Sequence, residues 1–277
     1  MKPEPLYNGR NLEPAYQLRY AWTGWPSGEA RFPGRTEEIV AGLRDAWETD
    51  GIRVLEDVCS AREVQILCSV KPHVAPTVFT ARLKGRLDHA LRKWGAGISF
   101  SRKVAMRSLG DNSTADVERY VAKQVSKERL ADPAFGEILR QFTIANPAVD
   151  LSAPTETLSG RYWYNLHLVL VTEERFRIVD AAWLGWIRDQ SIRIAQKKGH
   201  AISRLSVMPD HLHLALRGNV DQSPRDIALA FQNNLAYALG QCRVWRDTYY
   251  VGTFSEYDME AIRRSVRKHE REKELAP

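Results

Sequence analysis

The same order of expected secondary-structure elements occurs twice along this chain of 277 residues. In the second half, apolar spacings predict strand 162–172, helix 181–198, strands 201–208 and 211–217, helix 223–239, strand 249–254 and a basic helix at 257–273. The first half repeats this order at 16–25, 36–49, 52–59, 63–70, 75–93, 103–109 and 114–127. An internal repeat constrains the fold strongly, because each copy must build the same supersecondary unit.

Spacings within the repeat place a histidine pair of one half opposite a pair that lacks histidine. Glu63 and Pro76 are 13 residues apart, as are His211 and Pro224. On this alignment the segment His211-Leu212-His213 stands opposite Glu63-Val64-Gln65. The second half therefore keeps two histidines that the first half lacks.

The aligned C-terminal helices of the two halves differ in the opposite sense. Gly110 and Tyr120 are 10 residues apart, as are Ser255 and Ser265. The tyrosine of the first half therefore stands opposite a serine of the second. Each half has kept the side chains that the other has lost.

The element order strand, helix, strand, strand, helix, strand predicts a split βαβ arrangement. We therefore expect an α+β protein with two tandem ferredoxin-like domains, each on an antiparallel sheet, which together form a pseudo-dimer. The expected division is a domain at 1–124, a linker at 125–158 and a second domain at 159–277. Three prolines around one short expected helix at 135–142 indicate a linker with modest structure.

Composition favours a reduced protein and is compatible with a polyanionic partner, although many basic proteins bind no nucleic acid. The chain has 40 Lys and Arg against 34 Asp and Glu, and its isoelectric point is near 9.2. Its three cysteines, Cys59, Cys68 and Cys242, are odd in number and lack CxxC spacing, so we expect thiols, not disulfides. No run approaches the ~20 apolar residues that span a bilayer. We expect a soluble, cytoplasmic protein without membrane contact.

His211 and His213 alternate with the apolar Leu212, so they point to one face of their expected strand. Two imidazoles on one face can chelate a divalent cation. In an isolated sequence such a pair is more often a surface or packed pair of histidines. Tyr120 and Gln124 share a helical face in the same way, and an ordinary amphipathic helix is the alternative there.

Two basic runs are candidates for DNA binding, although an exposed charged face is the alternative for each. They are Arg82, Lys84 and Arg86 in the first half, and Arg263, Arg264 and Arg267 in the second.

The motifs together resemble a known family. The segment 208–214, Met-Pro-Asp-His-Leu-His-Leu, resembles the HUH motif of the single-tyrosine HUH transposases, which are insertion-sequence and repeat-associated enzymes acting on single-stranded DNA. Gly110-Asp111-Asn112 with the segment 117–124 resembles the family's nucleophile helix, and 75–86 resembles the segment after the HUH strand. The resemblance covers nearly all of both halves.

The resemblance implies a metal-dependent single-strand DNA endonuclease or transposase. By position, His211, His213 and Gln124 would hold a divalent ion, Mg²⁺ or Mn²⁺. Tyr120 would attack the scissile phosphate to form a covalent 5′-phosphotyrosine, which preserves the bond for rejoining. The implied partner is single-stranded DNA, with hairpin-containing ends.

The chain departs from the family's pattern of homodimers that exchange their tyrosine helices. Because the two halves are fused and have lost opposite parts, we hypothesise one composite site in a monomeric pseudo-dimer. The connector 125–158 can span roughly 110 Å if extended, so its length allows this. His269, four residues after Ser265, is an alternative to Gln124 as a metal ligand.

Three further possibilities stay open at the level of sequence. The chain could be a catalytically inactive, domesticated single-stranded DNA-binding protein or regulator. It could be a hydrolytic metallonuclease that uses water as its nucleophile. Alternatively, Tyr249, Tyr250 or Tyr257 could serve as a nucleophile within the second half.

Overall fold

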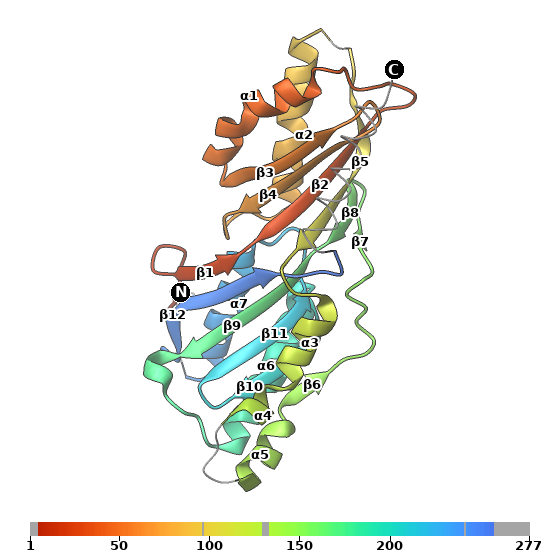
Figure 1. Ribbon diagram of the computed structural model, residues 1–277. Helices are drawn as coiled ribbons and strands as arrows, with labels where there is room; N and C mark the ends of the chain where they lie inside the picture. The colour runs from red at the N-terminus through yellow and green to blue at the C-terminus, as the bar shows by residue number, and fades with distance from the viewer. Residues whose placement is uncertain (1–4, 96, 129–132, 241, 258–277) are drawn as a thin grey trace.

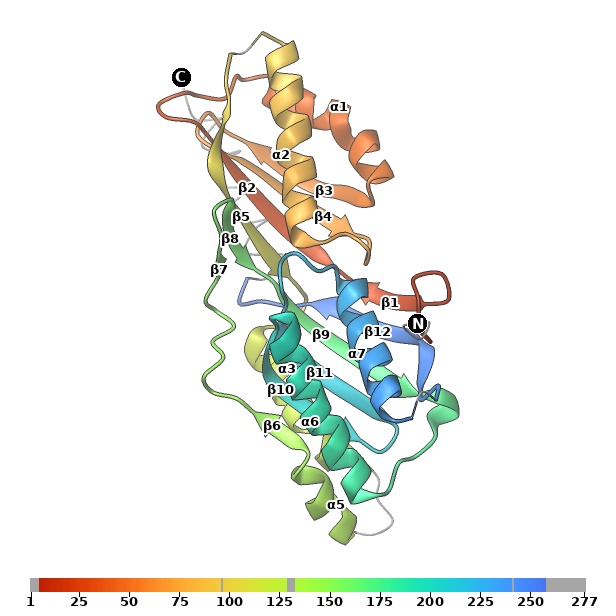
Figure 2. The ribbon, with the colours of Figure 1, turned by 180° about the vertical axis from the view of Figure 1, so that it is seen from behind.

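The computed structural model describes residues 5–95, 97–128, 133–240 and 242–257. Two six-stranded sheets lie end to end, and the long helices of both halves cover one side of the pair (Figure 1, Figure 2). Sheet A has the strand order β1-β12-β9-β11-β10-β6, and sheet B has the order β3-β4-β2-β5-β8-β7.

Both halves form the split βαβ unit that the repeat predicted. The first half consists of β2 (Arg19–Pro26), α1 (Thr36–Thr49), β3 (Ile52–Cys59), β4 (Val64–Val70), α2 (Pro76–Lys93) and β5 (Phe100–Leu109). The second consists of β9 (Asn165–Thr172), α6 (Ala181–Lys198), β10 (Ala201–Met208), β11 (His211–Arg217), α7 (Pro224–Ala238) and β12 (Trp245–Thr253). Within each set of four strands all pairings are antiparallel. The expected α+β class and ferredoxin-like folds are confirmed.

Local sequence signals explain where the second-half helices begin and end. Asp180 caps α6 by accepting hydrogen bonds from two backbone amides, and Gly199 ends the helix with φ 74°. Ser223 and Asp226 form a capping box at the start of α7, with Pro224 in its first turn.

The first expected strand of each half is divided in the structure into two strands that belong to different sheets. The sequence analysis expected one strand in each case. The expected strand at 16–25 divides at Leu18 into β1 (Glu13–Gln17) and β2. Strand β1 leaves the first half and pairs in parallel with β12 of sheet A. The expected strand at 162–172 divides at Tyr164, and β8 (Gly160–Trp163) pairs in parallel with β5 of sheet B. Each half thus adds one strand to the other half's sheet.

The segment between β5 and β8 contributes to both sheets. It contains α3 (Thr114–Ala122), α4 (Gln124–Lys127), α5 (Pro133–Arg140), β6 (Thr143–Ala145) and β7 (Thr155–Glu156). Strand β6 pairs with the edge strand β10, and β7 pairs with β8. A short 3-10 turn, η1 (Glu173–Arg175), follows β9. The expected helix at 257–273 lies outside the described residues apart from Tyr257.

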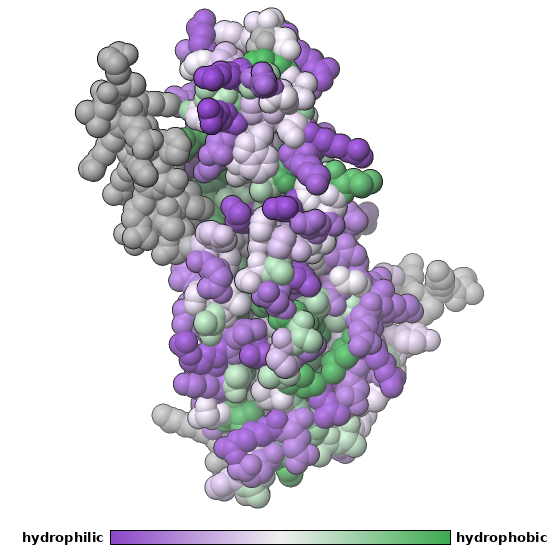
Figure 3. Space-filling view, turned by 90° about the vertical axis from the view of Figure 1, so that its right-hand side faces the viewer, coloured by the Kyte–Doolittle hydropathy of each residue, from purple (hydrophilic) through white to green (hydrophobic). Residues whose placement is uncertain are grey.

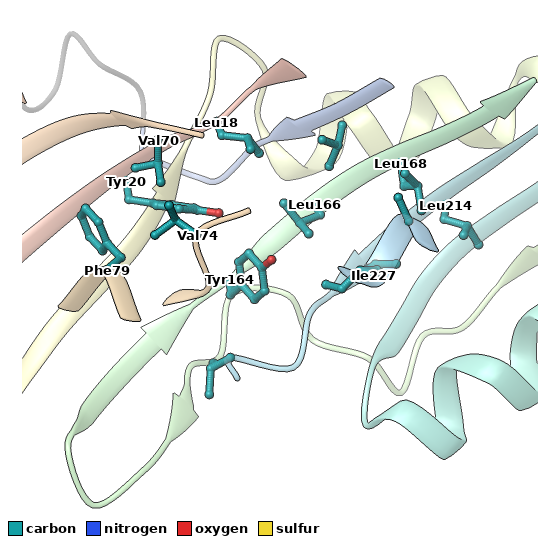
Figure 4. Close-up of a cluster of buried hydrophobic side chains, with 14 of the residues drawn as sticks. Leu18, Tyr20, Val70, Val74, Phe79, Tyr164, Leu166, Leu168, Leu214 and Ile227 are labelled. Carbon is teal, nitrogen blue, oxygen red and sulfur yellow. The ribbon is translucent and has the colours of Figure 1, made fainter. Parts of the chain in front are cut away.

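The two halves share one continuous hydrophobic core. Fully buried Tyr20 of β2 lies against Tyr164 at a ring-centroid distance of 6.1 Å and against Phe79 of α2 at 5.4 Å. Figure 4 shows these rings beside Leu166 of β9 at the boundary between the halves. Removing this much apolar surface from water favours a fixed arrangement of the two halves.

Viewed from the side along which the connector runs, the surface is mostly hydrophilic with small hydrophobic areas (Figure 3). None of the helices among the described residues combines the length and hydropathy needed to cross a bilayer.

Close backbone contacts at the boundary require glycine. A Cβ atom added at Gly110, just after β5, would lie 2.2 Å from the carbonyl oxygen of Thr253 in β12. A Cβ atom at Gly160 would lie 2.2 Å from the carbonyl oxygen of Val104 in β5. Since neither backbone atom can swing aside as a flexible side chain could, larger residues would push the halves apart.

We therefore expect Gly110→Ala to lower the free energy of unfolding by about 2 kcal/mol, as overpacking does. Chemical denaturation of the full chain would measure this. Gly34→Ala is the matched control, because an added Cβ meets nothing within 4 Å there. Equal stabilities of the two variants would contradict the requirement for glycine at the boundary.

Candidate active site on the open face of sheet A

A cavity of about 720 Å³ lies on the face of sheet A that α6 and α7 leave uncovered. Side chains from both halves line it, namely Asn112, Asp116, Val117, Tyr120, Gln124, His167, Val169, Val171, Arg175, His211, His213 and Tyr250. The sequence-predicted Tyr120, Gln124, His211 and His213 therefore meet in one pocket.

The two histidines stand on β11 directly after a two-residue turn. Antiparallel pairing joins Met208 to His211, so Pro209 and Asp210 form the turn between β10 and β11. His211 and His213 face the cavity, while the intervening Leu212 is fully buried. The strand alternation predicted from the sequence is what brings both imidazoles to one surface.

A carboxylate holds the first histidine. Nδ1 of His211 lies 2.6 Å from Oδ1 of Asp210, and the other carboxylate oxygen accepts a hydrogen bond of 3.0 Å from Arg175. Burial alone would raise the pKa of Asp210, but hydrogen bonds from His211 and Arg175 together lower it. An ionised Asp210 favours a proton on Nδ1 of His211 and leaves Nε2 available as a ligand.

His167 of β9 is a third histidine in the cavity, and the sequence analysis did not select it. Its Nε2 lies 3.0 Å from Nδ1 of His213. Burial lowers the pKa of His167 to about 4. Burial also lowers the pKa of His213 well below its usual value, and the neighbouring His167, His211 and Lys127 lower it further. Both imidazoles are therefore neutral near pH 7.

A signal for His167 was present in the sequence. Strand β9 alternates buried leucines with residues that face the cavity, and His167 is the polar member of the second set, with Val169 and Val171. A histidine in such an apolar strand lacks the HxH spacing that draws attention to β11. Only the sheet order, which puts β9 beside β11, brings it to His213.

Tyr120 lies on α3, a helix of the first half that packs on the second. Val117 and Val121 form a hydrophobic cluster with Ala215 of β11 and Phe254 after β12, and Leu151 of the connector completes it. Because Ala215 is small, the helix can approach the sheet closely. An ion pair of 3.3 Å between Glu118 of α3 and Arg204 of β10 joins the same two elements.

The tyrosine ring is presented to the histidines and stays accessible to a substrate. Its centroid lies 5.5 Å from that of His213 and 5.8 Å from that of His167, both edge to face. The side chain is 43% exposed, whereas most aromatic residues in the sheets are buried. The ammonium nitrogen of Lys127 lies 3.9 Å from the Tyr120 ring centroid.

Gln124 lies at a break in the expected helix. One helix was predicted over 114–127, but α3 ends at Ala122 and α4 begins at Gln124. The Gln124 side-chain Nε2 donates 2.8 Å to the Tyr120 carbonyl, one of the carbonyls left without a partner at the end of a helix. The amide oxygen Oε1 is therefore free to face the cavity, where Gln124 is buried.

The donor set suits a divalent cation that also binds substrate. Two imidazoles and one amide oxygen would provide three protein ligands and leave positions for phosphate oxygens. Among the described residues, no three His, Cys, Asp or Glu side chains are grouped to hold a metal ion. A site of this kind therefore depends on Gln124 as the third donor.

Of the other tyrosines that the sequence left open, only Tyr250 of β12 lines the cavity. Its ring lies 5.7 Å from that of His167, edge to face. Tyr249 is 2% exposed and belongs to the core. Tyr257 lies beside Arg107, whose guanidinium carbon is 4.8 Å from the Tyr257 ring centroid.

The corresponding face of sheet B lacks this chemistry. The amide of Gln65 donates 2.8 Å to Glu63, so these two side chains bond to each other. In sheet B, Thr23 of β2 pairs with Gln65, and in sheet A, Val169 of β9 pairs with His213. Ala21, two residues before Thr23, therefore occupies the position that His167, two residues before Val169, has in sheet A. Among the described residues, a crevice of about 20 Å³ lies there. Ser265 and His269 lie outside the described residues.

The basic side chains predicted to bind DNA in the first half have partners within it. Arg82 and Arg86 of α2 form ion pairs of 4.0 and 2.6 Å with Asp50. Lys84 donates 2.7 Å to the Ser101 carbonyl. Their role in DNA binding stays a prediction. The candidates of the second run, Arg263, Arg264 and Arg267, lie outside the described residues.

The structure combines two ferredoxin-like halves with a pocket of histidine and tyrosine side chains. A match to a protein-family model agrees with this combination. Residues 161–269 match the family model described as "Transposase IS200 like". The second half of the chain is therefore similar to this family of IS200-like transposases. No curated protein matches the chain.

Solved structures of transposases match parts of the chain. A protein from Deinococcus radiodurans R1 described as a transposase is 23% identical, with a TM-score of 0.30 over 38% of this chain and 88% of its own. A REP-associated tyrosine transposase bound to a REP hairpin is 13% identical, with a TM-score of 0.31 over 37% of this chain and 62% of its own.

The lowered pKa of His167 predicts a pH dependence of stability. The folded state resists protonation of this residue, while the unfolded chain accepts a proton near the ordinary pKa of 6.5. Stability is therefore lost as the pH falls from 6.5 towards 4. Between pH 6.5 and pH 5 we expect a loss of up to about 2 kcal/mol from His167.

Urea denaturation at a series of pH values would measure this loss in the wild type and in His167→Leu. The variant should show a shallower decline, because it has no imidazole to protonate at this position. Parallel curves for the two proteins would show that burial of His167 does not oppose its protonation.

Proposed function

We propose that this protein nicks and rejoins single-stranded DNA by transposase-type transesterification, at one composite metal-dependent site. The observation that carries the proposal is the approach of Tyr120, on a helix of the first half, to His213 of the second at 5.5 Å between ring centroids. The loss of both histidines at the corresponding place on sheet B supports a single site per chain.

His211, His213 and Gln124 are the proposed ligands of a divalent cation, Mg²⁺ or Mn²⁺. When bound, such a cation offsets negative charge on the oxygens of the scissile phosphate. The chain's own contribution is to keep the imidazole of His213 neutral by burial, which lowers its pKa, and to hold the Gln124 amide through its bond to the Tyr120 carbonyl.

Tyr120 is the proposed nucleophile. Its phenolic oxygen attacks phosphorus and loses its proton to solvent, which forms a covalent 5′-phosphotyrosine. The bond from phosphorus to the 3′ oxygen breaks, and the released 3′ oxygen takes up a proton. Attack by a 3′-hydroxyl on the phosphotyrosine reverses these steps and rejoins DNA without an outside energy source.

The proposed substrate is single-stranded DNA. The resemblance of the motifs to the transposase family predicts that its ends contain hairpins. A monomeric pseudo-dimer with one site handles one strand end at a time. Complete transposition would then need two molecules acting in turn, whereas a nicking role would need one. A domesticated protein that binds single-stranded DNA without cleaving it is the alternative.

Covalent trapping tests the proposal. Incubation of the full chain with 5′-labelled and 3′-labelled single strands and Mn²⁺ should give a protein–DNA adduct that survives denaturation and retains the segment on the 3′ side of the nick. Tyr120→Phe and His211→Ala should abolish the adduct, because one removes the nucleophile and the other a proposed ligand.

Tyr250→Phe is the matched control, because this tyrosine lines the same cavity on another strand. It should leave the adduct in place. Binding without any adduct would favour the inactive regulator, and cleavage retained by Tyr120→Phe would favour a water nucleophile. Loss of the adduct in Tyr250→Phe alone would move the nucleophile to β12.

Lys127 should assist the attack. Its ammonium group lies 3.9 Å from the Tyr120 ring centroid, where a positive charge stabilises the forming phenolate and the approaching phosphate. We expect Lys127→Met to slow adduct formation by about 10- to 100-fold at saturating DNA. Lys197→Met, in the last turn of α6, removes the same charge far from the cavity and should have little effect.

A further inference from the structure

The contact between His167 and His213 is a linear hydrogen bond between two rings. The nitrogen atoms are 3.0 Å apart, the ring planes differ by 14°, and the centroids are 5.3 Å apart. This combination arises when two imidazoles meet tip to tip in nearly one plane. One of the two nitrogens must carry the proton, because two lone pairs at this distance would repel each other.

We propose that His167 is a positioning residue, which accepts a hydrogen bond from Nδ1 of His213 and thereby turns the other nitrogen, Nε2, of His213 towards the cavity. The inference rests on the proposed function, in which His213 binds the cation. A histidine that ligates through Nε2 carries its proton on Nδ1, and that proton needs an acceptor. Among the described residues, Nε2 of His167 is the acceptor within reach.

The neighbouring ligand has the same kind of support from a different group. Nδ1 of His211 is held by the carboxylate of Asp210 at 2.6 Å, on the turn before β11. His213 is too far along the strand to use that turn, and its support comes from β9, the next strand of the sheet. Each proposed imidazole ligand thus has one fixed partner at Nδ1.

The ring of His167 is itself held in place. Tyr120 and Tyr250 contact it edge to face, at 5.8 and 5.7 Å between centroids. These contacts restrict rotation of the imidazole, so Nε2 stays directed at His213. Since Tyr120 is one of the two, the proposed nucleophile and the proposed ligand share a support.

Comparison of the two halves supports a role linked to His213. Where sheet B has Gln65 in place of His213, it has Ala21 in place of His167. The half that lacks the ligand also lacks its acceptor. A histidine needed only to fill space in β9 would have no reason to be absent together with its partner.

Metal affinity tests the proposal without relying on activity. Titration calorimetry of the full chain with Mn²⁺ should show that His167→Leu raises the dissociation constant by about 10- to 100-fold. His167→Gln should restore most of the affinity, because the amide oxygen of glutamine can accept a hydrogen bond near the position of Nε2.

His200→Leu is the matched control. His200 is also buried, but it packs against Phe231 of α7 and accepts a hydrogen bond from the Asn219 amide. Its loss should lower stability and leave Mn²⁺ affinity unchanged. Unchanged affinity in His167→Leu, or an equal loss in His167→Leu and His167→Gln, would overturn the proposal.

Nitrogen-15 NMR of histidine-labelled protein with Mg²⁺ gives a second and independent test. His213 should carry its proton on Nδ1 in the wild type, and a proton on Nε2 would overturn the proposal even if His167→Leu does not fold. Wild-type protein that binds no Mn²⁺, or that binds it equally well after His213→Ala, would instead refute the metal site of the proposed function.

Discussion

The seating of helix α3 on sheet A is the interaction on which the site depends. The helix follows the last strand of the first half, yet its apolar face packs on Ala215 and Phe254 of the second. Apolar contact alone would let a helix slide, but the ion pair between Glu118 and Arg204 adds a directional contact. The position of Tyr120 relative to His213 follows from this packing.

The boundary between the halves makes that packing possible. Strand β1 of the first half joins sheet A, and strand β8 of the second half joins sheet B, so each sheet contains a strand from the other half. Gly110 lets the chain pass directly over the backbone of β12 before α3 begins. A shared core around Tyr20 and Tyr164 then keeps the two sheets in one arrangement. Fusion of two similar units thus gives an asymmetric molecule, in which Tyr120, Gln124, His211 and His213 line a cavity on sheet A.

Burial gives the pocket its chemical character. Histidines on an exposed sheet face would be partly protonated near neutral pH, whereas burial keeps His167 and His213 neutral. At the other end of the pocket, the carboxylate of Asp210 is held between His211 and Arg175. The cavity therefore offers neutral nitrogen donors beside an accessible tyrosine, under a cationic Lys127.

Local sequence determined the elements of each half, because strand alternation, caps and prolines act over a few residues. The repeat predicted both ferredoxin-like units, and alternation predicted that His211 and His213 share a face. The roles of Tyr120, Gln124 and these histidines stay predictions, although the structure places all four in one cavity.

Long-range pairing decided what local patterns could not. The segment from 162 to 172, with its alternating, β-branched and aromatic residues, gives no sign that the chain changes sheets at Tyr164, because both parts of it have strand character. His167 became part of the pocket only through the neighbouring positions of β9 and β11. The break before Gln124 likewise depends on where α3 packs, since helical propensity alone favours continuing to Lys127. Such contacts join residues far apart in sequence, and only the tertiary structure specifies them.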